Sequence, residues 1–209
     1  KILFAEAEEN NKPKTPAWAR WSSCSLCEQR YHGVVWCALG WACWKTYVSR
    51  PETDMARGFA IQLLGSGLSA AKHHEDALSV KEARLSLMRR LGASVEDVFI
   101  AQGNLANSYQ FLGRLEEAMS LRRDVYSGCL KLNGEVHEET LRAANNYSLY
   151  ENPGATLDDL REAVTTLEDA ERTMRRVFGG AHPTTVDIGE CLQESRAALR
   201  ARETPASSA

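Results

Sequence analysis

The stretch Asn104–Tyr126, NLANSYQFLGRLEEAMSLRRDVY, decides the fold. Apolar and small side chains recur three and four residues apart on both sides of Gly113, which is typical of two amphipathic helices joined by a short turn. Glu116 and Glu117 open the second helix, where acidic side chains suit the positive end of the helix dipole. The stretch therefore predicts a helical hairpin.

The second helix of this hairpin has counterparts before it and after it in the chain. Three segments align on an anchor alanine, and each ends in a cation followed by a glycine. The cation suits the negative end of a helix dipole, and the glycine suits a left-handed helix cap. The anchors are Ala77, Ala118 and Ala163, and the cations are Arg90, Lys131 and Arg176.

A further helical pattern precedes each anchor. It carries a small residue at the equivalent place, Gly65, Ala106 or Ser148, so that two helices can approach closely. The repeated unit is thus a helical hairpin of about 42 residues, and about three such units are needed to bury their apolar faces. A last helix, beginning at Pro183, is predicted to cover the third hairpin. We expect an all-α fold, an α-solenoid of about three helical hairpins.

The array resembles tetratricopeptide (TPR) repeats of the kinesin-light-chain type. The resemblance covers roughly residues 56–200, and it implies that the first helix of each hairpin lines a concave groove that binds a protein or peptide. One departure from the pattern is ENPGATLDDL after Tyr150, where Pro153 and Gly154 must interrupt a helix, so we expect a distorted third hairpin. The matching residues are Asn104, Leu105, Tyr109, Gly113 and Ala118, with the junctions GEVHEET and GGAHPTT.

Five polar residues are predicted to face a partner, by their positions in the repeat. The side chain of asparagine can bond the main chain of an extended peptide through both its carbonyl and its amide. The alternative is that each residue is simply part of a solvated face. The five residues are Asn104, Asn107, Arg142, Asn145 and Asn146.

No catalytic motif is found in the array. The sequence has no phosphate-binding glycine loop, no nucleophile elbow and no helical zinc-protease motif. His137 and His182 fall at matching junctions and are interpreted as capping or loop residues, as are His73 and His74. We therefore predict that the chain is not an enzyme.

A second region, Trp21–Trp44, holds four of the six cysteines and four of the five tryptophans. Three interpretations are open. In the first, Cys24, Cys27, His32 and Cys37 have the spacing of a CCHC zinc knuckle, which would bind single-stranded nucleic acid, although the glycines usual in such a knuckle are absent.

In the second interpretation, CSLCEQRYHG resembles the closing segment of a RING-CH zinc finger, a module of some ubiquitin ligases. The resemblance implies that Cys24 and Cys27 are two of eight ligands for two Zn²⁺ ions, so the site would be incomplete in this chain. The other ligands are expected upstream of Lys1, and KILFAEAEENN would be a helix between ligand pairs.

In the third interpretation no metal is bound, and Cys37 and Cys43 are core residues. All three interpretations share one prediction, that an apolar helix packs on the first repeat hairpin. Its apolar residues are Trp36, Leu39, Trp41, Trp44, Tyr47 and Val48.

Composition and charge narrow the classes of partner. A net charge of −3 over 209 residues gives no electrostatic reason to expect binding to nucleic acid or to a membrane. The sequence has no signal peptide and no apolar run long enough to span a bilayer, so we expect a soluble cytoplasmic protein.

The predicted organisation has four parts. They are a zinc-finger remnant at 1–32, a linking helix at 33–50, the repeat array at 51–202 and a disordered tail at 203–209. The predicted function is a scaffold that binds a protein or peptide. The alternatives are the substrate-recognition part of a RING-CH ubiquitin ligase and a CCHC nucleic-acid binder.

Overall fold

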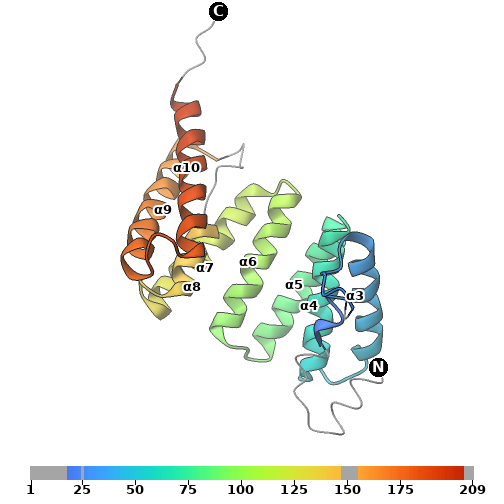
Figure 1. The fold of residues 1–209 in the computed structure, drawn as a ribbon. Helices are drawn as coiled ribbons and strands as arrows, with labels where there is room; N and C mark the ends of the chain where they lie inside the picture. Colours follow the sequence, from blue (N-terminus) through green and yellow to red (C-terminus); the bar gives the residue numbers. More distant parts are fainter. Residues whose placement is uncertain (1–17, 25, 147–154, 205–209) are drawn as a thin grey trace, which may run out of the picture. The chain divides into compact units, whose positions relative to one another are not determined.

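The computed structural model describes residues 18–24, 26–146 and 155–204. This part of the chain forms a series of α-helices (Figure 1), and its one β-type pairing is an isolated antiparallel bridge between Ser23 and Arg30. Contacts divide the chain into two units, Lys1–Leu112 and Gly113–Ala209. Each unit is described by itself.

Four helices form the first unit, and each packs on the next along the chain. Side-chain caps fix two of the helix starts. The carboxylate of Asp54 accepts the amide hydrogen of Ala56, and the hydroxyl of Ser94 accepts that of Asp97, so that amides without partners inside the helix are satisfied. The helices are α3 (Gly33–Tyr47), α4 (Met55–Ala70), α5 (His74–Arg90) and α6 (Val95–Phe111).

Glycines set the closest approach of two helices in the first unit. A Cβ atom added at Gly67 of α4 would lie 2.9 Å from the Cα of Cys37 and 2.8 Å from the carbonyl oxygen of Trp36, both in α3. A Cβ atom at Gly40 of α3 would lie 3.0 Å from the Cα of Leu64. The two backbones therefore touch at these points, where no larger residue fits.

Helix α3 lies within the range 33–50 predicted for a linking helix but ends at Tyr47, and it packs on α4. Tyr47 is buried and Trp44 is half-buried, but Trp41 and Val48 keep 43% and 38% of their surface exposed. The prediction that these two residues pack inside was wrong. The reason is that α3 is apolar on every side, while α4 is the one helix of the described unit that covers it extensively.

The second unit is built around the contact between α9 and α10, which run side by side (Figure 1). Leu160, Leu167, Met174 and Ile188 are completely buried and are the largest hydrophobic side chains of its core. Pro183 stands in the first turn of α10, as predicted. The helices are α7 (Leu115–Asn133), α8 (Glu138–Asn146), α9 (Leu157–Val177) and α10 (Pro183–Glu203).

The predicted helix ends are confirmed. Gly92, Gly134 and Gly179 follow α5, α7 and α9 with φ angles of +67°, +81° and +86°, in the left-handed region that glycine adopts at least cost. Arg90, Lys131 and Arg176 lie in the last turns of these helices. The predicted helix KILFAEAEENN and the break in the third hairpin lie outside the described residues, as do residues 205–209 of the tail predicted at 203–209. Glu203 was wrongly assigned to this tail, because it is the last residue of α10.

Helix α9 begins with a reciprocal cap. The hydroxyl of Thr156 accepts the amide hydrogen of Asp159, and the carboxylate of Asp159 accepts the amide hydrogen of Thr156. Arg123 of α7 donates to the same carboxylate at 2.6 Å. The hydrogen bond from the Thr156 side chain is the largest cause that lowers the pKa of Asp159, and it is aided by Arg123 and opposed by partial burial.

We expect Gly67→Ala to destabilise the first unit by about 1–3 kcal/mol, because the new methyl group meets the backbone of α3. Gly58→Ala, in the same helix, is the control. A Cβ atom there has no neighbour within 4 Å, so it should stabilise by up to about 1 kcal/mol through helix propensity. Urea unfolding followed by circular dichroism measures both. Equal stability of the two variants would contradict the close approach of α3 and α4.

The free energy of unfolding should depend on Asp159 in acid. Because its pKa is lower in the folded chain than the ordinary value of about 3.9, its stabilising effect is present above that pH and is lost as pH falls through the folded pKa. Asp159→Asn should therefore lower the stability at pH 7 by about 1 kcal/mol and flatten its acid dependence.

Urea unfolding at a series of pH values measures this dependence. The control is Asp158→Asn, since the Asp158 side chain is almost fully exposed. An acid dependence that is identical in Asp159→Asn and in the unaltered protein would contradict the role of the cap.

Candidate functional site

Asn104 and Asn107, the predicted partner residues of the first unit, lie exposed on α6. Their spacing of three residues places both amides on one face of the helix. Two large apolar side chains, Ile100 and Phe111, occupy the same face at either end and keep 52% and 67% of their surface exposed. These four residues, called the α6 stripe below, combine amide groups with apolar contact area.

Helix α6 is fixed on α5 by polar contacts as well as by its core residues. The ammonium group of Lys81 donates to the hydroxyls of Ser69 (2.9 Å) and Ser108 (2.7 Å) and to the carbonyl oxygen of Asn104 (3.3 Å), so it joins α4, α5 and α6. Burial lowers the pKa of Lys81. The Tyr109 hydroxyl donates to the Glu82 carboxylate at 2.8 Å. These contacts hold α6, which carries the stripe, against α4 and α5.

Three predicted partner residues lie on α8 in the second unit, and their environments differ. Arg142 is paired with Glu138 (2.8 Å) and Glu139 (3.1 Å) of its own helix. Asn145 is half-buried, and its side-chain oxygen has no hydrogen-bond partner in the described structure. Asn146 is exposed at the end of the helix. These residues share a helix, but they form no row of similar exposed amides.

Three of the histidines lie at or next to the starts of helices. The ring of His137 accepts the amide hydrogen of Glu139, which is the capping role predicted for it. His182 is the N-cap residue, just before α10, but its side chain makes no capping hydrogen bond, and its ring packs at 5.2 Å from Phe178. His74 stacks on Phe111 of the α6 stripe at 5.0 Å.

Cys24 and Cys27 lie in a tight hairpin. The amide of Cys24 donates to the carbonyl oxygen of Gln29 (2.8 Å), and the amide of Glu28 donates back to the carbonyl oxygen of Cys24 (2.9 Å). Glu28 has a φ angle of +58°, a conformation that is rare for a residue with a side chain and that persists only where the surrounding structure imposes it. The hairpin, called the cysteine knuckle below, thus holds a strained backbone around two thiols.

Hydrogen-bond donors converge on the sulfur of Cys24. The backbone amides of Cys27 and Leu26 donate to it, followed in strength by the Cys27 thiol, and these contacts lower the pKa of Cys24. The Tyr31 hydroxyl also donates to this sulfur, and partial burial together with the charge of Cys24 raises the pKa of Tyr31. Stabilised thiolates are the form of cysteine that binds metal ions.

Tryptophans hold this region on the first unit. Trp18 packs at 5.5 Å from the ring of Tyr47 and at 5.2 Å from that of Phe59, and Trp21 joins the same apolar cluster with the buried Cys43. The cysteine knuckle is therefore attached to α3 and α4 of the first unit.

The other two candidate ligands have different surroundings. Cys37 is buried in α3 among Leu64, Leu68 and Ala77, which agrees with its interpretation as a core residue. His32 is exposed at the N-cap, just before α3. Within the described residues, no three cysteine, histidine or acidic side chains gather so that they could hold a metal ion.

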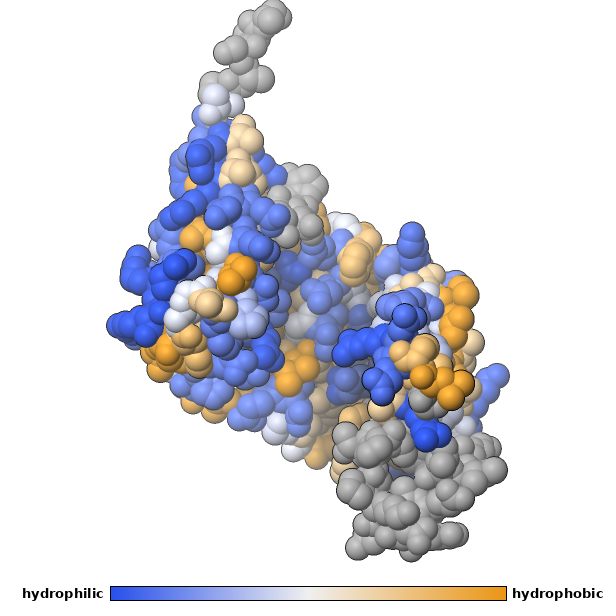
Figure 2. All heavy atoms as spheres, viewed as in Figure 1, coloured by the Kyte–Doolittle hydropathy of each residue, from blue (hydrophilic) through white to orange (hydrophobic). Residues whose placement is uncertain are grey.

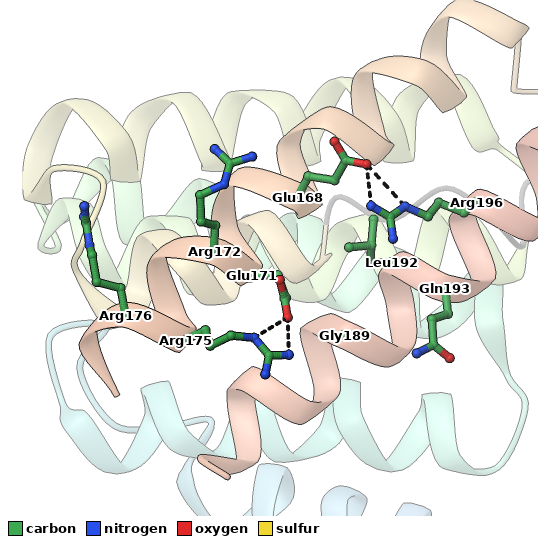
Figure 3. A pocket seen from close by; sticks show the side chains of 9 residues that line it. All are labelled: Glu168, Glu171, Arg172, Arg175, Arg176, Gly189, Leu192, Gln193 and Arg196. Atoms are coloured by element: carbon green, nitrogen blue, oxygen red, sulfur yellow. Dashed lines mark hydrogen bonds and ion pairs between the residues drawn. The ribbon is translucent and has the colours of Figure 1, made fainter. Parts of the chain in front are cut away.

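A charged groove of about 590 Å³ lies between α9 and α10 (Figure 3). Arg175 turns toward Glu171 of its own helix, and Arg196 of α10 turns toward Glu168 of α9, so carboxylates of α9 pair with these two cations. The surface over α9 and α10 is mainly hydrophilic (Figure 2). Exposed ion pairs of this kind contribute little to stability or affinity, so the α6 stripe is the better candidate site.

No family model and no curated protein matches the chain. Two crystal structures of a Podosopora anserina putative kinesin light chain with nearly identical TPR-like repeats are similar to it. Their TM-scores are 0.63 and 0.62 at 18% identity, with 97% of this chain and 85% and 86% of those chains covered. BtubC (BKLC) from P. vanneervenii has a TM-score of 0.54 at 17% identity, over 84% of this chain and 76% of that one.

The fold is an all-α array of TPR-like repeats. This confirms the predicted fold class and its resemblance to repeats of the kinesin-light-chain type. None of the helices in the described residues is both long enough and apolar enough to cross a membrane.

Proposed function

We propose that the protein is an interaction scaffold of the cytoplasm that binds an extended peptide segment of a partner protein on the α6 stripe. The observation that carries the proposal is the exposure of two amide side chains between two exposed apolar side chains on one rigid helix. The structures with the same fold support a scaffold function in general, since arrays of TPR-like repeats expose long helix faces.

The chemistry of the stripe suits a peptide main chain. Each asparagine offers a carbonyl acceptor and an amide donor, so Asn104 and Asn107 can satisfy N–H and C=O groups that an extended peptide exposes. Ile100 and Phe111 add apolar area for two side chains of the partner, and burial of apolar area supplies most of the driving force for association.

The α8 residues are a second part of this proposal. Asn146 is exposed and available to a partner, whereas Arg142 must exchange its two carboxylate partners in order to bind one. We therefore expect Arg142, Asn145 and Asn146 to contribute less to binding than the α6 stripe.

We also propose that Cys24 and Cys27 bind Zn²⁺. The observation that favours this is the cysteine knuckle, in which backbone amides donate to the first sulfur and the second thiol lies beside it. Two thiolates separated by two residues are a common half of a tetrahedral zinc site. Zinc here would hold the hairpin closed and would supply no chemistry to the α6 stripe.

The two alternatives to a scaffold depend on further ligands. A CCHC knuckle that binds nucleic acid requires Cys37, which lies buried in the core of α3 and α4. A RING-CH ubiquitin ligase requires two zinc ions and eight ligands, of which Cys24 and Cys27 would be two. A ubiquitination assay on a longer chain that contains two bound zinc ions would test the ligase alternative.

Removal of both amides should weaken peptide binding. A peptide is first selected from a randomised library on the unaltered chain and then titrated by fluorescence anisotropy. Because each lost hydrogen-bonding group costs about 0.5–1.5 kcal/mol, the double variant Asn104→Ala, Asn107→Ala should bind roughly tenfold to a hundredfold more weakly.

The matched control is Gln193→Ala, which removes an exposed amide from α10. It should leave the affinity unchanged. Peptides that bind the double variant as tightly as the unaltered chain would contradict a site on the α6 stripe.

Zinc binding should depend on the two cysteines of the knuckle alone. In reducing buffer, Cys24→Ser and Cys27→Ser should each lose tightly bound zinc, as measured by atomic absorption after dialysis, since each removes one thiolate ligand. His32→Ala and Cys191→Ser should retain it. Loss of zinc from His32→Ala would favour the CCHC knuckle instead.

A further inference from the structure

The proposed zinc site has two sulfur ligands, whereas a closed zinc site has four ligands. All six cysteines and all five histidines of the sequence fall within the described residues, yet no third ligand-type side chain joins Cys24 and Cys27 there. Cys37, Cys43 and Cys129 are buried in the cores of their units, and Cys191 packs against the core of the second unit. No remaining thiol of this chain is therefore positioned to complete the site.

The knuckle is open to another molecule. Cys27 is exposed, and Leu26, its neighbour at the tip of the hairpin, keeps 93% of its surface exposed. Cys24 is half-buried, so a second molecule meets the pair from the side of Cys27.

We propose that two copies of this chain share one zinc ion through their cysteine knuckles. Cys24 and Cys27 of each copy would supply the four thiolates of a tetrahedral site. The inference rests on the proposed zinc binding and adds the partner that completes it. A tetrahedron of two identical pairs has a two-fold axis through the metal, which is the symmetry of most homodimers.

Apolar side chains near the knuckle support a contact between copies. Val34 and Val35 begin α3, a few residues after the knuckle, and both are exposed, Val34 to 74%. Like Leu26, each leaves apolar area in water in a monomer, and a second copy can cover such area. The amides that donate to the Cys24 sulfur also offset the net negative charge of a zinc ion bound by four thiolates.

The test uses the reduced, metal-free chain, to which Zn²⁺ alone is added. Zinc content by atomic absorption should reach about one ion per two chains, and the molar mass by light scattering should double. Removal of zinc with a chelator should restore the original mass. Cobalt substituted for zinc should show the spectrum of four thiolate ligands. Cys24→Ser and Cys27→Ser should abolish the doubling, whereas Cys191→Ser, the control, should keep it.

Two results would overturn the sharing of zinc. One is a monomer that retains one zinc ion per chain, which would uphold the zinc site but place its remaining ligands within the chain or in solvent. The other is a dimer that forms equally well without zinc or in Cys27→Ser. A chain that binds no zinc at all would overturn the zinc proposal itself, and the peptide titration on the α6 stripe would be unaffected.

Discussion

In the described residues, the apolar side of a helix is covered mainly by its neighbours along the chain. In the first unit, Leu64 and Leu68 of α4 pack with Cys37 of α3 and Ala77 of α5, so one cluster spans three consecutive helices. The helices must approach closely for this burial to be complete, and that requirement explains the glycines and alanines at the crossing points. In α6, the residues that are not buried in this way include the exposed Asn104 and Asn107.

Much of the fold could be predicted because its determinants are local. A glycine that follows a cation stops a helix through its own backbone freedom and the helix dipole, so the ends of α5, α7 and α9 follow from a few residues each. The anchors Ala77, Ala118 and Ala163 are all buried, as their periodicity indicates.

Contacts between helices could not be predicted in the same way. The approach at Gly40 and Gly67 depends on the angle at which α3 crosses α4, and no spacing within either helix encodes that angle. Similarly, Trp41 has the apolar character of a core residue, but its burial depends on a covering helix that the described unit does not provide. The hydrophobicity of a sequence thus identifies the apolar face of a helix, but it does not identify the neighbouring helix that covers that face.

In the candidate site, too, locally determined features could be predicted from the sequence, and others could not. The register of the repeat predicts the exposure of Asn104 and Asn107, since a helix face is fixed once its buried positions are known. Ile100 and Phe111 were missed because large apolar residues are ordinarily assigned to the core, although their spacing from the asparagines places them on the same exposed face. For Arg142, the sequence already contained the competing partners Glu138 and Glu139 one turn earlier.

The two proposed sites occupy different helices of the first unit, and this separation makes them compatible. The cysteine knuckle is attached at α3 and α4, whereas the stripe lies on α6, which packs on α5. A zinc ion shared through the knuckles would therefore leave the stripe of each copy exposed. Two stripes in one assembly bind a partner with two matching segments more tightly than either stripe alone, because the second contact is made within the complex. Pairing through the knuckles would thus strengthen binding at the stripes without any change in the contacts of α6.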